Sequence, residues 1–322
     1  MTPTCDERWV QLRGPRQLNV SRRRFKCRGS SQFSTAFWSG QDLGSIKRRL
    51  SADGKLVHSR WLSYTSSEAR RLGFVGIIRL APAKMRTFRL ATLGCIALLP
   101  SFLKRPCYRL FFGYKIGRRV HVGLSIIDAR RCEIDADTSI GHFNVIIGVT
   151  SLRMGDHVRI GHLNIIRGGD EVRIGRYSDI IRLNEINSIP DPEVVNPVDP
   201  TLIIGPGTII TTGHKIDFTD RVEIGRRAII GGRNSSLWTH NRQRTQPISI
   251  GDYAYVGSEI RMAPGASVPS RCIVGIGSVI VGKIDAEGWL IAGVPAKRVK
   301  ELSAEDRFLV ERKTRLDLPD DV

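Results

Sequence analysis

The feature that most constrains the fold is a six-residue repeat of apolar side chains in the C-terminal third of the chain. Every sixth residue from Ile250 to Ile280 is apolar: Ile250, Val256, Met262, Val268, Val274 and Ile280. This period matches neither a helix face, at 3.6 residues, nor strand alternation, at two. It predicts a chain that turns a corner every six residues and points one aliphatic side chain inward on each of the three faces of a coil.

The same spacing recurs through most of the chain. The earlier runs are Ile134, Ile140, Ile146 and Leu152; Met154, Ile160 and Ile166; Ile174, Ile180 and Ile186; Ile204, Ile210 and Ile216; and Ile224 with Ile230. A single coil cannot bury its apolar faces, so coils must stack, and hexapeptide repeats are a signature of parallel β-helices. We therefore predict an all-β fold, a parallel β-helix over residues 113–300.

The N-terminal segment is strongly basic. Of the formal net charge of +19, residues 1–84 carry +12, from 17 Lys and Arg against 5 Asp and Glu, and they show no sustained apolar period. We expect a disordered extension there. An acidic membrane or a nucleic acid is the alternative partner, but the segment has no nucleic-acid-binding motif, so no nucleic acid is expected. Met85 offers a second start, which would make residues 1–84 an over-extended beginning.

We predict an amphipathic helical segment over residues 85–112. The apolar run Leu90–Leu103 is broken by Pro100 and falls short of the roughly 20 residues that span a bilayer. Lys104, Arg105 and Arg109 follow it. We expect this segment to cover the first open coil. The alternative is an interfacial helix in peripheral contact with the inner membrane.

For the C-terminal segment, residues 301–322, we predict a short helix followed by a tail. Ser303 followed by Asp306 has the form of a capping box, which starts a helix over residues 304–315. Such a helix would shield the strand edges of the last coil.

The six cysteines form no C-x-x-C pair, so neither a zinc site nor a disulfide framework is expected. A reducing, cytoplasmic location follows.

Two segments interrupt the repeat, and loops that leave a rigid scaffold often carry function. They are residues 187–201 and 231–247. His240 lies in the second, with Asn234 nearby as a supporting residue. An exposed imidazole with a pKa of about 6.5 suits a general base. His214, with Asp217 three residues on, is the alternative base.

A metal site is not expected. His157 and His162 are five residues apart, and solenoid carbonic anhydrases bind zinc where a Gly-His is followed five residues later by a second His. In this sequence those later positions are Arg167, after His162, and Ile147, after His142.

Residues 202–300 resemble the hexapeptide-repeat acyltransferases, in particular the bacterial sugar O-acetyltransferases. The matching stretches are GHKIDFT, NSSLWTH, ISIGDYAYVGS, MAPGASV, VGIGSVI and AGVPAKRVK. The chain departs from the family pattern at Pro269, where glycine is usual, and in VGKIDAEGW, which replaces the common Thr-Lys-Asp-Val-Pro turn.

The resemblance implies a homotrimer of left-handed β-helices that binds acetyl-CoA between adjacent subunits and requires no metal. The family's catalytic histidine corresponds to His240. Its acetyl-CoA contacts correspond to Gly257, Ser258, Ile276, Val281, Lys297, Arg298 and Lys300. The last three offer cations to the nucleotide phosphates.

The function expected from the resemblance is acetyl transfer from acetyl-CoA to a sugar hydroxyl in surface polysaccharide or lipopolysaccharide biosynthesis. The acceptor would be a sugar, a nucleotide-sugar or a lipid-linked saccharide. An amino-sugar N-acyltransferase and a non-catalytic scaffold subunit are the alternatives.

Overall fold

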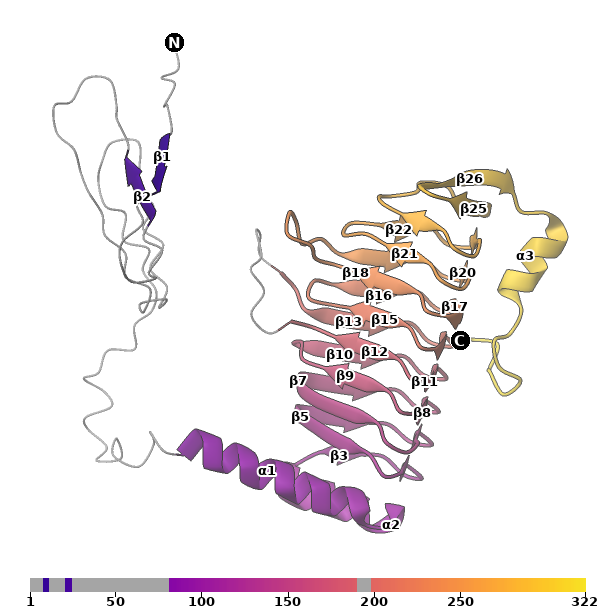
Figure 1. Ribbon diagram of the computed structural model, residues 1–322. Helices are drawn as coiled ribbons and strands as arrows, with labels where there is room; N and C mark the ends of the chain where they lie inside the picture. Colours follow the sequence, from indigo (N-terminus) through magenta and orange to yellow (C-terminus); the bar gives the residue numbers. More distant parts are fainter. Residues whose placement is uncertain (1–7, 12–20, 25–80, 190–197) are drawn as a thin grey trace, which may run out of the picture. The chain divides into compact units, whose positions relative to one another are not determined.

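A computed structural model describes residues 8–11, 21–24, 81–189 and 198–322 (Figure 1). Most of the basic segment 1–84, including its predicted disorder, lies outside these ranges. Within it, β1 (Arg8–Gln11) pairs antiparallel with β2 (Ser21–Arg24).

The chain forms two compact units, and the larger one, residues 76–322, begins with two helices. They are α1 (Ala81–Leu98) and α2 (Ser101–Phe112), and Pro100 separates them because it disfavours helical backbone at Leu99. Gly113 ends α2 in the left-handed conformation, at φ 66°, and its N–H donates to Arg109 O. The predicted helical segment is therefore present. No helix in the described ranges is both long and apolar enough to cross a bilayer.

The rest of this unit is a parallel β-solenoid with three faces. Face A contains β3 (Lys115–Ile116), the second halves of β5 (Ile126–Ile134) and β7 (Val145–Met154), β10 (Glu171–Ile174), β13 (Thr201–Ile204), β16 (Val222–Ile224), β19 (Ile248–Ile250) and β22 (Ser267–Val268). These eight strands mark eight turns in the part of the chain that the structure describes.

Faces B and C complete each turn. Face B contains β4 (His121–Val122), β6 (Ser139–Ile140), β8 (Arg159–His162), β11 (Asp179–Arg182), β14 (Ile209–Thr212), β17 (Ile229–Arg233), β20 (Tyr255–Val256), β23 (Ile273–Val274) and β25 (Trp289–Gly293). Face C contains the first halves of β5 and β7, β9 (Ile165–Arg167), β12 (Glu185–Asn187), β15 (Lys215–Asp217), β18 (Ser236–Trp238), β21 (Arg261–Met262) and β24 (Val279–Ile280). The strands are parallel, as the repeat predicts.

The hexad residues form the core. Every residue of the repeat series is at most 2% exposed, and each stacks on its counterpart in the next coil, as Ile180 does on Ile160 and Ile210. The two-residue slips lie at the corner between faces C and A. At one of them, Gly168 and Gly169 have φ of 77° and 84°. A Cβ on Gly169 would lie 2.2 Å from the Phe218 ring, so the corner needs glycine there.

Different elements cover the two ends of the solenoid. At the first coil, Leu93 and Ile96 of α1 and Tyr108 of α2 are buried in the core, which confirms the expected cover. At the other end the prediction was wrong in two respects. The edge of face B is covered by β26 (Ala296–Glu301), antiparallel to β25, rather than by the terminal helix. That helix, α3 (Ala304–Glu311), has the Ser303–Asp306 capping box but ends four residues earlier than expected.

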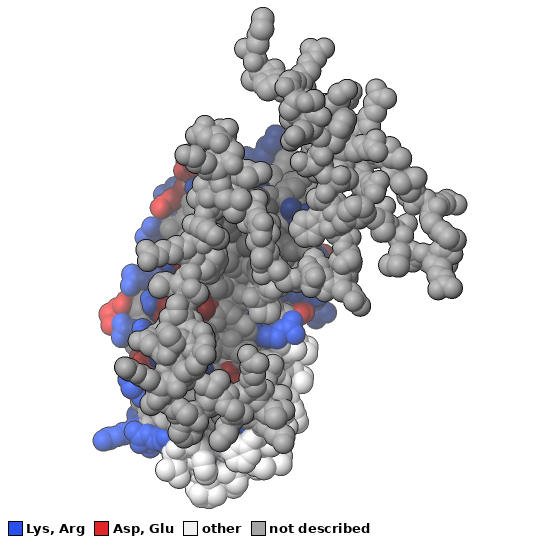
Figure 2. All heavy atoms as spheres, turned by 90° about the vertical axis from the view of Figure 1, so that its left-hand side faces the viewer, with Lys and Arg blue, Asp and Glu red and all other residues white. Residues whose placement is uncertain are grey.

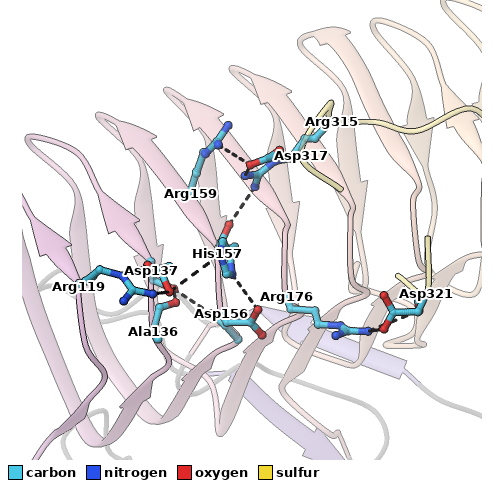
Figure 3. Close-up of polar contacts among 12 residues, drawn as sticks. Arg119, Ala136, Asp137, Asp156, His157, Arg159, Arg176, Arg315, Asp317 and Asp321 are labelled. Carbon is cyan, nitrogen blue, oxygen red and sulfur yellow. Dashed lines mark hydrogen bonds and ion pairs between the residues drawn. The ribbon is translucent and has the colours of Figure 1, made fainter. Parts of the chain in front are cut away.

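The tail after α3 returns along the corner between faces A and B (Figure 3). Arg315 is buried, and it donates to Asp179 Oδ1 at 2.9 Å and to His157 O at 2.9 Å. Asp317 accepts from Arg159 at 2.8 Å, and Asp321 accepts from Arg176 at 2.6 Å. Charged side chains therefore fasten the tail across several coils.

Candidate active site

The second interruption of the repeat is shorter than predicted. β18 is part of face C, since Leu237 is fully buried and stacks between Ile216 and Met262. Only residues 239–247 leave the solenoid. The loop is compact, because Asn241 Oδ1 accepts from the N–H groups of Gln243 and Arg244 at 2.8 and 2.9 Å.

His240 opens this loop and lies against Asp217 of the preceding coil. Its Nδ1 is 2.7 Å from Asp217 Oδ2, and its side chain is 25% exposed. A carboxylate can only accept, so Nδ1 carries the proton and neutral His240 keeps a lone pair on Nε2. The imidazole is therefore oriented for proton transfer through Nε2.

Two threonines hold Asp217, and sequence reasoning missed both. Thr239 donates to Asp217 Oδ2 through its N–H and its hydroxyl, each at 2.9 Å. Thr219 donates to Oδ1 in the same two ways, at 3.1 and 2.6 Å. Asp217 is buried, and these bonds satisfy its charge. Asp-Phe-Thr and Thr-His are the sequence signals, but only the stacking of β15 under β18 brings them together.

His214, the alternative base, lies inside the solenoid rather than at the surface. It extends a buried ladder of Asn144, Asn164 and Asn184, and its own N–H donates to Asn184 Oδ1 at 3.0 Å. Ser235 N–H donates to its Nδ1 at 3.2 Å.

The other ring nitrogen, Nε2 of His214, lies 2.9 Å from Thr211 Oγ1. Burial lowers the pKa of His214 to about 4. Asp217 faces His240 and not His214, which corrects the predicted pairing.

Asn234 does not touch His240 in the described residues. It precedes β18, in the left-handed conformation at φ 60°, whereas His240 follows β18. The two residues therefore lie at opposite ends of one strand.

The residues matched to acetyl-CoA contacts fall into three groups. Gly257 and Ser258 lie at the corner between faces B and C, where Gly277 N–H donates to Ser258 O at 3.0 Å. This bond stacks Ile276, which is 74% exposed, above Ser258. Val281 lies at the corner between faces C and A, after β24.

The third group is on β26. Lys297, Arg298 and Lys300 are all exposed. Arg298 Cζ lies 5.2 Å from the Trp289 ring centroid, and Lys300 pairs with Asp306 at 3.6 Å.

The corner that holds Ser258 is tightly packed. A Cβ on Gly232, at φ 64° in the coil below, would fall 1.6 Å from Ser258 Oγ. Glycine is therefore required under Ser258. Among the described residues, no group of three or more His, Cys, Asp or Glu side chains could hold a metal ion.

Comparison with known proteins gives partial matches. No family model matches the chain. A galactoside O-acetyltransferase of Escherichia coli is 25% identical over 120 residues, which are 37% of this chain and 50% of that protein. The apolar hexads and the parallel solenoid agree with this relationship. The chain is similar, over these partial matches, to hexapeptide-repeat acetyltransferases.

A second relative of this hexapeptide-repeat protein is YJL218W of Saccharomyces cerevisiae, provisionally named as an acetyltransferase. It is 24% identical over 98 residues, 30% of this chain and 41% of that protein. The chain thus spans no more than half the length of these curated relatives.

Two solved structures resemble the hexapeptide-repeat chain in part. One is a UDP-N-acetylglucosamine acyltransferase from Campylobacter jejuni, at 20% identity over 59% of this chain and 71% of that one, with a TM-score of 0.46. The other is the polySia-specific acetyltransferase NeuO, at 20% identity over 58% and 86%, with a TM-score of 0.41. At these scores the likeness carries no conclusion about activity.

Proposed function

We propose that the protein transfers an acetyl group from acetyl-CoA to a hydroxyl of a sugar. The observation that carries the proposal is the His240–Asp217 pair, at 2.7 Å, on a loop beside intact coils. Its histidine is exposed enough to meet an acceptor, and its carboxylate is buried and fully hydrogen-bonded. This is the arrangement of a general base with an orienting acid.

In the proposed reaction, His240 Nε2 takes the proton of the acceptor hydroxyl as its oxygen attacks the thioester carbonyl carbon. Asp217 stabilises the imidazolium that forms. When the C–S bond breaks, the imidazolium returns the proton to the CoA thiolate, so the products are an acetyl ester and free CoA. The Ser258 N–H has no acceptor among the described residues, which makes it a candidate donor to the oxyanion.

A single chain does not bring these groups together. Ser258 and His240 flank opposite ends of face C, and about five strand residues at 3.3 Å each separate them by roughly 16 Å. We infer that His240 of one subunit works with Ser258 of a neighbour. A closed homotrimer would contain three equivalent sites of this kind.

The name of the Escherichia coli relative, galactoside O-acetyltransferase, supports a sugar hydroxyl as acceptor. We assign the protein to surface polysaccharide or lipopolysaccharide synthesis in the cytoplasm, with a sugar, nucleotide-sugar or lipid-linked saccharide as acceptor. An amino-sugar N-acyltransferase would use the same base. The product separates the two, since hydroxylamine cleaves an ester but not an amide.

The test is release of CoA thiol from acetyl-CoA by the wild type and by His240→Ala, with a panel of sugars and nucleotide-sugars. We expect release to require an acceptor and to fall about 10²- to 10⁴-fold in the variant, the range for a general base. Folding and oligomeric state should be unchanged. No release with any acceptor, together with no thermal stabilisation by acetyl-CoA, would identify a non-catalytic scaffold.

A further inference from the structure

Helix α2 carries large apolar side chains on the side that faces away from the solenoid. Phe102 is 76% exposed, Leu110 is 80% exposed and Phe111 is 61% exposed. Its inner side combines a lysine with aromatic residues: Lys104 is 1% exposed, Tyr108 is fully buried and Phe112 packs against the core. Large apolar side chains therefore lie on both sides of α2, whereas an ordinary surface helix turns its one apolar face to the core.

Polar anchors on the inner side fix the rotation of α2. Lys104 Nζ donates to Ala97 O at 2.8 Å and to Gly123 O. Ser101 Oγ accepts from Val122 N–H at 3.0 Å. Rolling the helix to bury Phe102 would break these bonds and leave the ammonium of Lys104 without acceptors. The apolar outer face is therefore built into the fold.

The charge on α2 itself has a single sign. Residues 81–127 contain 9 Lys and Arg and no Asp or Glu, and three of the nine, Arg89, Lys115 and Arg119, pair with carboxylates of later residues. Arg105 and Arg109 flank the stripe of Phe102 and Leu110, and together these residues line a shallow hollow. Neither arginine forms an ion pair within the described residues. In Figure 2, the atoms at the lowest end that are not grey are white and blue.

We propose that the outer face of α2 docks on an anionic lipid bilayer. The exposed Phe and Leu side chains would enter the boundary between headgroups and acyl chains, and Arg105 and Arg109 would contact lipid phosphates. A second copy of the chain fits less well. A self-complementary contact would bring the two arginine pairs together with no carboxylate between them. This docking does not depend on the proposed acetyl transfer.

The experiment is flotation of the full chain with vesicles of mixed phosphatidylglycerol and phosphatidylcholine. The test variant is Phe102→Ser/Leu110→Ser/Phe111→Ser. We expect its binding to fall at least tenfold, because it removes the inserting side chains. The matched control is Phe308→Ser/Leu309→Ser on α3, whose side chains are 71% and 52% exposed. The control should bind as the wild type does.

The contribution of charge is tested with Arg105→Glu/Arg109→Glu and with vesicles of phosphatidylcholine alone. Each lost cation should weaken binding to the anionic vesicles about fivefold, and the neutral vesicles should bind much less wild type. Hydrogen exchange should slow in α2 and not in α3 when anionic vesicles are added.

Two results would overturn the proposal. If both α2 variants bind like the wild type, the basic segment 1–84 or another surface makes the contact. If light scattering without vesicles shows a larger assembly for the wild type than for the apolar variant, a second copy covers α2. The flotation assay contains no acetyl-CoA, so its result does not depend on whether the protein transfers acetyl groups.

Discussion

Two histidines near Asp217 in sequence have opposite environments. His240 shares a hydrogen bond with the buried carboxylate and keeps one ring nitrogen at the surface. His214 is enclosed by the Asn184 side chain, Ser235 and Thr211, and no carboxylate of the described ranges pairs with it. Burial penalises the imidazolium of His214. We therefore place the proposed general base at His240 and not at His214.

Replacing His214 by asparagine should remove part of the acid sensitivity of the fold. The pKa of His214 is about 4 in the folded chain, against about 6.5 when unfolded. Between these values only the unfolded chain binds the proton, so stability falls as pH drops from about 6.5 to about 4, by about 3 kcal/mol. His214→Asn would continue the asparagine ladder and lose this dependence. Urea unfolding at pH 7 and pH 4.5 measures it.

The same variant should retain acetyl transfer, in contrast to His240→Ala. An identical loss of stability on acidification in both wild type and His214→Asn would show that His214 does not titrate as proposed.

The sequence singled out His240 and Asp217 but paired Asp217 with the wrong histidine. Asp217 stands three residues from His214 and 23 from His240. Proximity along the chain favoured a pairing of Asp217 with His214. In a solenoid, however, the nearest neighbour of a corner residue belongs to the next coil. The partner follows from the stacking of β15 under β18, which requires the lengths of both coils.

At the scale of elements, the apolar period predicts the core strands, because each hexad residue has one place on one face. It does not predict the C-terminal tail. Residues 312–322 have no apolar period, and ion pairs with earlier coils hold them in place, such as Asp317 with Arg159 and Asp321 with Arg176. Pairs about 150 residues apart leave no local pattern.

Asp317→Asn should loosen this tail in a pH-dependent way. Hydrogen bonds from Arg315 lower the pKa of Asp317 to about 2. Its stabilisation is complete above about pH 4, the unfolded value, and is lost as pH falls to about 2. At pH 7 we expect the melting temperature of Asp317→Asn to be roughly 1–3 °C below that of the wild type. The decrease is small because Asp317 is partly exposed.

Thermal melts between pH 2 and pH 7 would show the wild type and Asp317→Asn converging at low pH. Asp179, whose pKa is raised by burial, is common to both proteins. Asp320→Asn is the matched control, since Asp320 is 92% exposed and its ion pair is with Lys313 of the tail itself. An equal loss in the control, or a gap that persists at pH 2, would contradict the assignment.

At the scale of the whole molecule, the separation of His240 and Ser258 predicts complementation between inactive chains. His240→Ala lacks the base. Ser258→Trp should block the binding corner, because Gly232 packs directly under Ser258 and leaves no room there for a larger side chain. Trimers assembled from both variants should regain activity at roughly a quarter of the sites, by random assortment around a closed ring. CoA release after co-refolding measures it. No recovery in verified mixed trimers would place both groups in one subunit's site.

The stacking of coils also sets the distance between His240 and the end of the solenoid that α2 covers. Helices α1 and α2 lie across one end of the solenoid (Figure 1), and five strand steps on face C separate β5 at that end from β18, next to His240. At 4.7–4.9 Å per step, this is roughly 24 Å. With α2 on a bilayer and the solenoid axis normal to it, the base stands at least that far above the lipid headgroups, because α2 itself lies between β5 and the bilayer. A lipid-linked acceptor must therefore present a saccharide several units long, and the solenoid would act as a ruler that passes over sugars close to the lipid.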